Sequence, residues 1–170
     1  TLATLGNGID FGDLLAGRND HDAVSSSTRG FIVAGANAPA KTNSIEFVTI
    51  ASTGNGSDFG DLMAANTGAK GGCGSATRAI LAGGYDPSPG GLTTQIQYVI
   101  MSSGGGANDW GDLAIAKNGI APGSNDTRGI LQGGATPDYT SVMTSINIQS
   151  LGNDSNFGSH LEGAIRNASC

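Results

Sequence analysis

Apolar positions along the chain come in short runs separated by clusters of Gly, Asn, Asp and Ser. The middle of the chain shows the order of these runs. A Gly-rich segment at 68–75 precedes an apolar run at 77–84, a partly alternating segment at 94–102 and a segment with an aromatic residue at 108–113. Short β-prone runs bounded by turn residues predict strands. No segment keeps an apolar period of 3.6 residues, so we expect no helix.

The same four segments recur along the whole chain. The segment Asp58–Leu62 is identical to Asp10–Leu14, it differs from Asp109–Leu113 by one aromatic exchange, and Asn156–Leu161 is a decayed fourth copy. The aromatic residues of the four copies are 48, 51 and 47 residues apart, and they are Phe11, Phe59, Trp110 and Phe157. Self-similarity at this period indicates a repeat architecture.

The other segments align in the same way. The second predicted strand of each repeat begins with Thr-Arg and ends in Gly, at 28–35, 77–84 and 127–134. The third strand lies at 44–52, 95–103 and 142–150. The loops between them differ most in sequence, and they are Ala36–Asn43, Tyr85–Thr93 and Ala135–Ser141. Four antiparallel strands in each 47–51 residues, with Gly closing the second strand, are the plan of a β-propeller blade.

The repeat divides the chain into one array. A half blade with its third and fourth strands is expected at 1–15, blades at 16–63, 64–114 and 115–162, and the first strand of a further blade at 163–170. If the two ends met in a ring, that blade would lack its second strand and leave backbone groups unpaired. We therefore expect an ordered piece of a longer array, a ring completed by another chain, or an array that stacks without closing.

The apolar run, the Gly-Gly pair and the spaced aromatic positions resemble the kelch repeat over essentially the whole chain. The sequence VTIASTGN at 48–55, before the motif Asp58–Leu62, and the TRG and GG at the two ends of 127–134 look more particularly like kelch-like arrays of tailed phages, notably marine and cyanobacterial ones. Members of that group appear as fibre, tail or other virion-associated proteins. The resemblance implies an all-β, non-enzymatic structural and recognition module of a virion or other extracellular assembly.

The composition and the net charge argue against several classes of binding partner. The 170 residues include 29 Gly and only 13% charged residues, and the net charge is −6. An acidic chain argues against binding nucleic acid or an anionic membrane surface. No run of 18 apolar residues exists, so we expect no membrane insertion. The two cysteines, Cys73 and Cys170, have a comparable phase in different repeats, and we interpret both as small buried residues.

Charged residues also follow the repeat. An Asp after each of the first three aromatic-Gly pairs precedes an Arg by 16 or 17 residues, and Ser159 replaces the Asp in the fourth copy. We predict structural ion pairs between blades, because Arg and carboxylate form specific bidentate contacts. The alternative is a ring of Arg around an anion-binding channel. The predicted pairs are Asp13 with Arg29, Asp61 with Arg78, and Asp112 with Arg128.

The repeated aromatic residues are predicted to fill the space between blades, and the alternative is that they are platforms on which sugars stack. Loops on a rigid scaffold commonly carry recognition. The predicted contacts with a virion protein or a cell-surface glycan therefore lie in the variable loops. They are Asn37, Lys41, Tyr85, Asp86, Asp138 and Tyr139.

No catalytic site, cofactor or metal is predicted. Asn7, Asp10 and Asp13 present oxygen atoms suited to Ca²⁺, but Asx turns explain the same residues and the EF-hand order is absent. His21 and His160 belong to no repeated motif, and no nucleophile motif accompanies them. Two alternatives stay open: a propeller enzyme of the galactose-oxidase or epimerase kind, and an intracellular kelch adaptor for protein partners.

Overall fold

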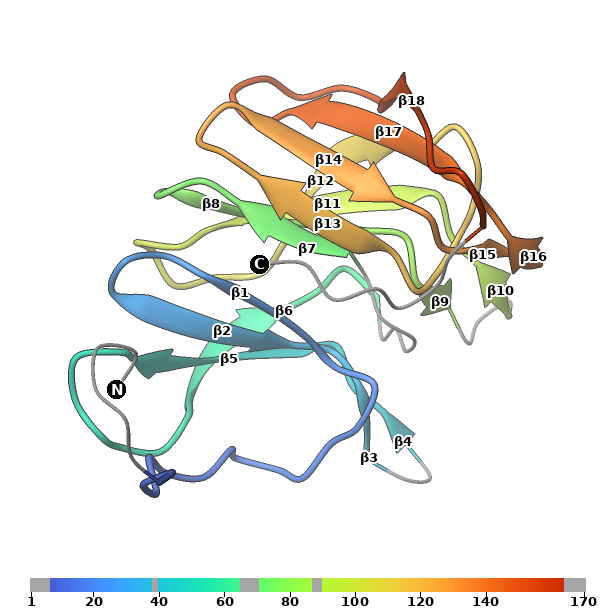
Figure 1. Ribbon diagram of the computed structural model, residues 1–170. Coiled ribbons are helices and arrows are strands. Elements are labelled where there is room, and N and C mark those ends of the chain that lie inside the picture. Colours follow the sequence, from blue (N-terminus) through green and yellow to red (C-terminus); the bar gives the residue numbers. More distant parts are fainter. Residues whose placement is uncertain (1–6, 38–39, 65–70, 87–89, 164–170) are drawn as a thin grey trace.

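The computed structural model describes residues 7–37, 40–64, 71–86 and 90–163. These residues form strands and loops, and no helix occurs among them. Three four-stranded antiparallel sheets make up the body of the molecule (Figure 1). The predicted all-β class and its four-stranded antiparallel sheets are therefore confirmed.

The strands of each sheet follow one another in chain order, so that each sheet is a simple meander. The first sheet contains β1 (Asp22–Ser25), β2 (Arg29–Val33), β5 (Ser44–Thr49) and β6 (Ser57–Asp61). The second contains β7 (Gly71–Gly74), β8 (Arg78–Ala82), β11 (Gln95–Ile100) and β12 (Asn108–Asp112). The third contains β13 (Ala121–Ser124), β14 (Arg128–Gln132), β17 (Val142–Asn147) and β18 (Ser155–Ser159).

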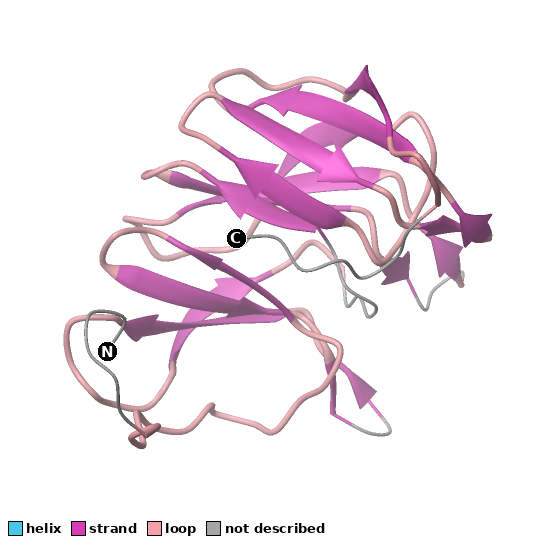
Figure 2. Cartoon of the chain, in the orientation of Figure 1, coloured by secondary structure: helices cyan, strands magenta, loops and turns pink. Residues whose placement is uncertain are grey.

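A short hairpin lies in each loop between the second and third strands of a sheet. The three hairpins extend from the same end of the stacked sheets (Figure 2). Their strands are β3 (Ala36–Asn37) with β4 (Ala40–Lys41), β9 (Tyr85–Asp86) with β10 (Gly91–Leu92), and β15 (Ala135–Thr136) with β16 (Asp138–Tyr139). The variable loops are thus held in a regular backbone form.

The sheets stack face to face, and their first strands β1, β7 and β13 lie in contact along one side of the stack. One core cluster joins the first and second sheets, and another joins the second and third. Successive residues of a strand point to opposite faces of a sheet. Leu81 therefore packs in the former cluster and Ile80 in the latter, and both are fully buried. The second sheet is covered on both faces.

The repeated aromatic-Gly pair is a β-bulge. In the register between β5 and β6, Ile45 is opposite Gly60 and Glu46 is opposite Asp58, so that Phe59 is the extra residue of the bulge. Gly60 has φ +142°, and a Cβ there would lie 2.5 Å from the carbonyl oxygen of Gly105 in the next sheet. Corresponding shifts occur in the other two sheets. Glycine is needed because this position combines a positive φ with close contact to the neighbouring backbone.

The bulge also connects successive sheets through backbone hydrogen bonds. The amide of Gly105 donates to the Phe59 carbonyl at 2.9 Å, and the amide of Gly152 donates to the Trp110 carbonyl at 3.1 Å. The first copy of the motif makes the same contact with the first sheet, since Gly54 donates to the Phe11 carbonyl at 2.8 Å. Residues 7–21 nevertheless form no named strand, only a bridge from Asn19 to Ala36.

We use the word joint for each region in which a copy of the repeated aromatic motif packs against the sheet that follows it, and there are three among the described residues. The first joint lies between residues 10–18 and the first sheet, the second between the first and second sheets, and the third between the second and third sheets. Each contains one copy of the aromatic motif. The strand predicted within 163–170 lies outside the described residues, apart from Gly163.

Candidate functional site

The four repeated aromatic residues, all predicted to lie in the core, differ in burial. Phe11 in the first joint is 39% exposed, so the prediction is wrong there. Phe59 and Trp110 are buried in the second and third joints, where they make edge-on contacts with Phe31 and Tyr98. Phe157 is 50% exposed on β18, at the outer face of the third sheet. The same side chain type is thus a core residue inside the stack and a surface residue at its end.

The repeated arginines connect sheets, but not through carboxylates. Arg29 donates from Nη1 to the Met101 carbonyl at 2.9 Å, across the second joint. Arg78 donates to the Ile148 carbonyl at 3.0 Å, across the third joint. Each guanidinium also lies against an aromatic ring. Arg128 is exposed on the outer face of the third sheet.

These contacts correct the predicted Asp–Arg pairs. Within the described ranges, the ion pair that the structure contains is Arg18–Glu46. The Asp13, Asp61 and Asp112 side chains are exposed, whereas a backbone carbonyl of the next sheet accepts a hydrogen bond from each of the half-buried Arg29 and Arg78. The second alternative, a ring of free arginines around a channel, does not fit Arg29 and Arg78 either, because both are hydrogen-bonded within joints.

The predicted contact residues lie on the three hairpins. Lys41 of the first hairpin places its ammonium 4.4 Å from the ring centre of Tyr85 in the second, so adjacent hairpins touch. Tyr139 is 67% exposed on the third hairpin. The remaining three are Asn37 on β3, Asp86 on β9 and Asp138 on β16.

Sequence reasoning missed a buried polar position on the third strand of each sheet. It is occupied by Glu46, Gln97 and Thr144, all of them buried. The first two accept a backbone amide from the loop that follows the preceding motif: Leu15 donates to Glu46 and Met63 donates to Gln97, both at 2.9 Å. The buried side chains thus supply acceptors for these backbone amides, which explains why polar residues occur inside the joints.

In the third joint, a different residue accepts the backbone amide of the corresponding loop. Thr144 is too short to reach the loop, and the amide of Ala114 donates instead to Asp154 Oδ1 at 2.7 Å. Lys117, five residues after the motif's second Asp, takes the place that Arg18 has in the first joint. Arg18 pairs with Glu46, whereas Lys117 and Asp154 form no ion pair among the described residues.

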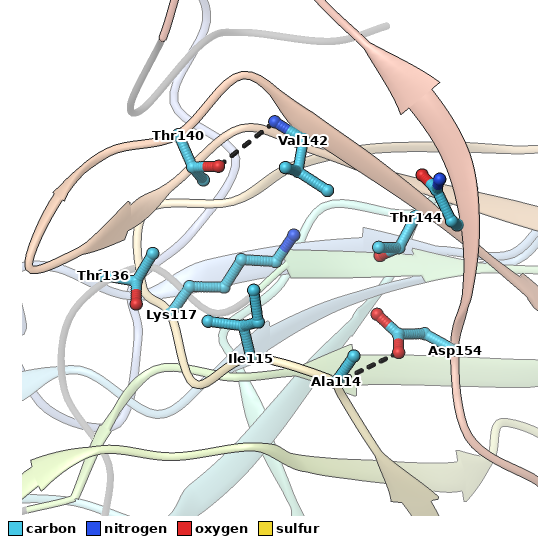
Figure 3. Close-up of a pocket in the computed structure, with 9 residues that line it drawn as sticks. Ala114, Ile115, Lys117, Thr136, Thr140, Val142, Thr144 and Asp154 are labelled. Carbon is cyan, nitrogen blue, oxygen red and sulfur yellow. Dashed lines mark hydrogen bonds between the residues drawn. The ribbon is translucent and has the colours of Figure 1, made fainter.

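A cavity of about 220 Å³ results at the third joint (Figure 3). Lys117 extends into the space between Val142, Thr144 and Asp154, and Thr136 and Thr140 at the base of the third hairpin also line it. Lys117 is only 3% exposed. Burial lowers the pKa of Lys117, and the negative charge of Asp154 opposes that shift.

Two oxygen atoms at this cavity have no hydrogen-bond partner. They are Thr144 Oγ1 and Asp154 Oδ2, and both are buried. The Thr140 hydroxyl, in contrast, accepts the amide of Val142 at 3.1 Å. The site therefore combines a cationic donor with a carboxylate and a hydroxyl that are free to bind.

The remaining predictions concern single residues. Cys73 is buried, and burial raises the pKa of its thiol to about 12; Cys170 lies outside the described residues. Asp10 Oδ1 accepts the amide of Gly12 at 3.1 Å, which is the geometry of an Asx turn. Within the described residues, no three His, Cys, Asp or Glu side chains gather as a metal site would require.

Two further findings concern the whole chain. The described residues contain no helix with the length and the apolar character needed to span a membrane. Protein-family models give no match to this sequence, and no curated protein matches it.

Proposed function

We propose that this chain is an array of kelch-like propeller blades that serves as a non-enzymatic structural and recognition module of a phage tail, fibre or other extracellular assembly. The observation that carries the proposal is the joint. Its bulge, its backbone hydrogen bonds and its Arg-to-carbonyl contact recur between sheets. Blades of an array need such a repeated contact, because each blade buries its apolar face only against a neighbour.

The outer face of the third sheet carries half of a joint, and residues 10–18 cover the outer face of the first sheet only in part. On the third sheet, Arg128, Ile130, Met143 and Phe157 line a hollow of about 440 Å³. On the first sheet, Ile50 is 47% exposed, whereas its counterparts Met101 and Ile148 are buried. Arg29 and Arg78 each donate to a carbonyl of the following sheet, but no sheet follows Arg128 among the described residues. Ile50 lies at the position equivalent to Met101 and Ile148, whose carbonyls accept these hydrogen bonds. We infer that further blades, from the same chain or another, cover these faces.

The three hairpins supply the recognition surface in this proposal. They extend from one end of the stack, and their exposed Tyr139 and the adjoining Lys41 and Tyr85 offer aromatic and charged contacts. A rigid scaffold that presents variable loops suits binding to a virion protein or a cell-surface glycan.

The mass of the native particle, measured together with the mass of the dissociated chain, tests the array. We expect a particle with more than three blades, and we expect Phe157→Asp to dissociate it or to lower its melting temperature, because a charge would be buried at the joint. Tyr139→Asp is the matched control, since it makes the same change on an exposed hairpin. A three-sheet monomer that is indifferent to Phe157→Asp would contradict the proposal.

A further inference from the structure

The three joints place different side chains at the same internal position. In the first joint, Glu46 accepts the loop amide and also neutralises Arg18. In the second, Gln97 accepts the loop amide, and its own amide group donates to Gln95 at 2.7 Å. The side chains of Glu46 and Gln97 are thereby hydrogen-bonded from within the protein, although Arg18 Nε has no partner. These two joints show what the fold requires at this position.

The third joint leaves binding capacity unused. The cavity of about 220 Å³ is lined by Thr144, whose side chain is shorter than that of Glu46 or Gln97. Thr144 Oγ1 and Asp154 Oδ2 are buried there without a partner, and Lys117 is buried beside them. Polar groups removed from water cost free energy unless something hydrogen-bonds to them. The first joint also has a hollow, of about 370 Å³, but its cation Arg18 is already paired with Glu46. The third joint therefore has polar groups that are free to bind a ligand.

The charges of the site indicate what it binds. An anion attracted by Lys117 would meet the Asp154 carboxylate, and a cation attracted by Asp154 would meet the Lys117 ammonium. A neutral ligand with adjacent hydroxyls satisfies both, because a hydroxyl accepts from an ammonium and donates to a carboxylate. The Thr144 hydroxyl is placed to bind a third oxygen.

The shape of the cavity agrees with the same ligand. Ile115 and Val142 line it with carbon atoms, against which the C–H face of a sugar ring packs. Its volume is below the roughly 300–1,000 Å³ of pockets for drug-sized ligands, so it accommodates a single ring. Thr136 and Thr140 place the cavity at the base of the third hairpin. A longer saccharide bound here would continue toward that hairpin.

We propose that this cavity is a binding site for one neutral sugar residue, held by Lys117, Asp154 and Thr144. The inference rests on the proposed recognition function and names its ligand class, but it concerns the third joint rather than the exposed hairpin tips.

Titration with neutral sugars, followed by ¹⁵N chemical shifts, tests the proposal on the whole chain. The probes are glucose, galactose, mannose and N-acetylglucosamine. We expect at least one to bind saturably and to shift the amides of Ala114, Thr144 and Asp154. Thr144→Gln places the Gln97 side chain of the second joint into the cavity and should weaken binding at least tenfold. Lys117→Met should do the same by removing the donor.

The control is the double variant Arg18→Met with Glu46→Gln, which removes the equivalent cation of the first joint without leaving a buried charge unpaired, and it should leave sugar affinity unchanged. Thermal unfolding of each variant shows that the fold persists. The proposal is overturned if no sugar binds, if Thr144→Gln and Lys117→Met bind as the wild type does, or if only inorganic phosphate binds. None of these results affects the particle mass that tests the array, so the two proposals fail separately.

Discussion

Buried charge at a joint is the feature with the largest effect at the scale of single residues. Glu46 is 1% exposed, and it serves both Arg18 and the amide of Leu15. Removing it leaves the buried cation Arg18 without a counter-charge and the amide of Leu15 without its partner. We expect Glu46→Ala to lower the free energy of unfolding by about 3–5 kcal/mol, measured by urea denaturation.

The second joint supplies the control for this prediction. Gln97 does without an ionised carboxylate there. The double variant Arg18→Met with Glu46→Gln copies that arrangement and should regain most of the lost stability. If the double variant is as unstable as Glu46→Ala, the unpaired arginine is not the cause.

Lys117 makes stability depend on pH in a predictable direction. Burial places its pKa in the folded chain below its usual value of 10.5. Between these two pKa values the unfolded chain binds more protons, so this group makes the folded state more stable as pH rises through that window. The cost of the buried charge is fully present at pH values below that window.

Replacing Lys117 with Met should therefore stabilise the chain at pH 7 and by less above pH 10. The measurement is the difference in unfolding free energy between variant and wild type at several pH values, which cancels other alkaline titrations. A difference that does not change with pH would show that burial does not shift this group.

At the scale of the element, the bulge on the fourth strand decides how sheets stack. Gly60 has a positive φ and no room for a Cβ against Gly105. We expect Gly60→Ala to cost about 2–4 kcal/mol, because it adds strain and separates two sheets. Gly104→Ala is the matched control in the same joint, where a Cβ would meet Phe59 only at 3.9 Å. It should change stability by at most about 0.5 kcal/mol.

The predicted strands could be recognised from the sequence because each is marked by residues close together in the chain. In β8, Arg78–Ala82, a short apolar run between turn residues is a local signal, and the strand lies within the run predicted for it. The hairpins in the variable loops were not predicted, since two-residue strands such as β15 leave no periodicity to detect.

At the scale of the whole molecule, burial is unequal among the three sheets. The second sheet has a core on each face, whereas the third has a core on one face and a hollow at Phe157 on the other. In a Phe157→Asp variant, which keeps that outer face free, we expect the amides of β8 to exchange with solvent more slowly than those of β14. Hydrogen exchange followed by mass spectrometry measures this difference. Equal exchange would show that the stack opens as one cooperative unit.

The sequence alone determined the all-β class, the order of the four strands and the repeat, because these depend on signals between residues close together in the chain. Phe59 and Arg78 were recognised as structural residues from their phase for the same reason. The division into blades at 16–63, 64–114 and 115–162 stays a prediction.

Only the tertiary structure decided what those residues contact. Arg29 and Arg78 were expected to meet carboxylates, yet they donate to carbonyls 72 and 70 residues away. The cavity at Lys117 depends on Thr144 and Asp154 meeting a loop from the preceding repeat. Such contacts follow from the stacking of sheets, which places side chains from successive repeats within hydrogen-bonding distance, and no local pattern in the chain records that distance.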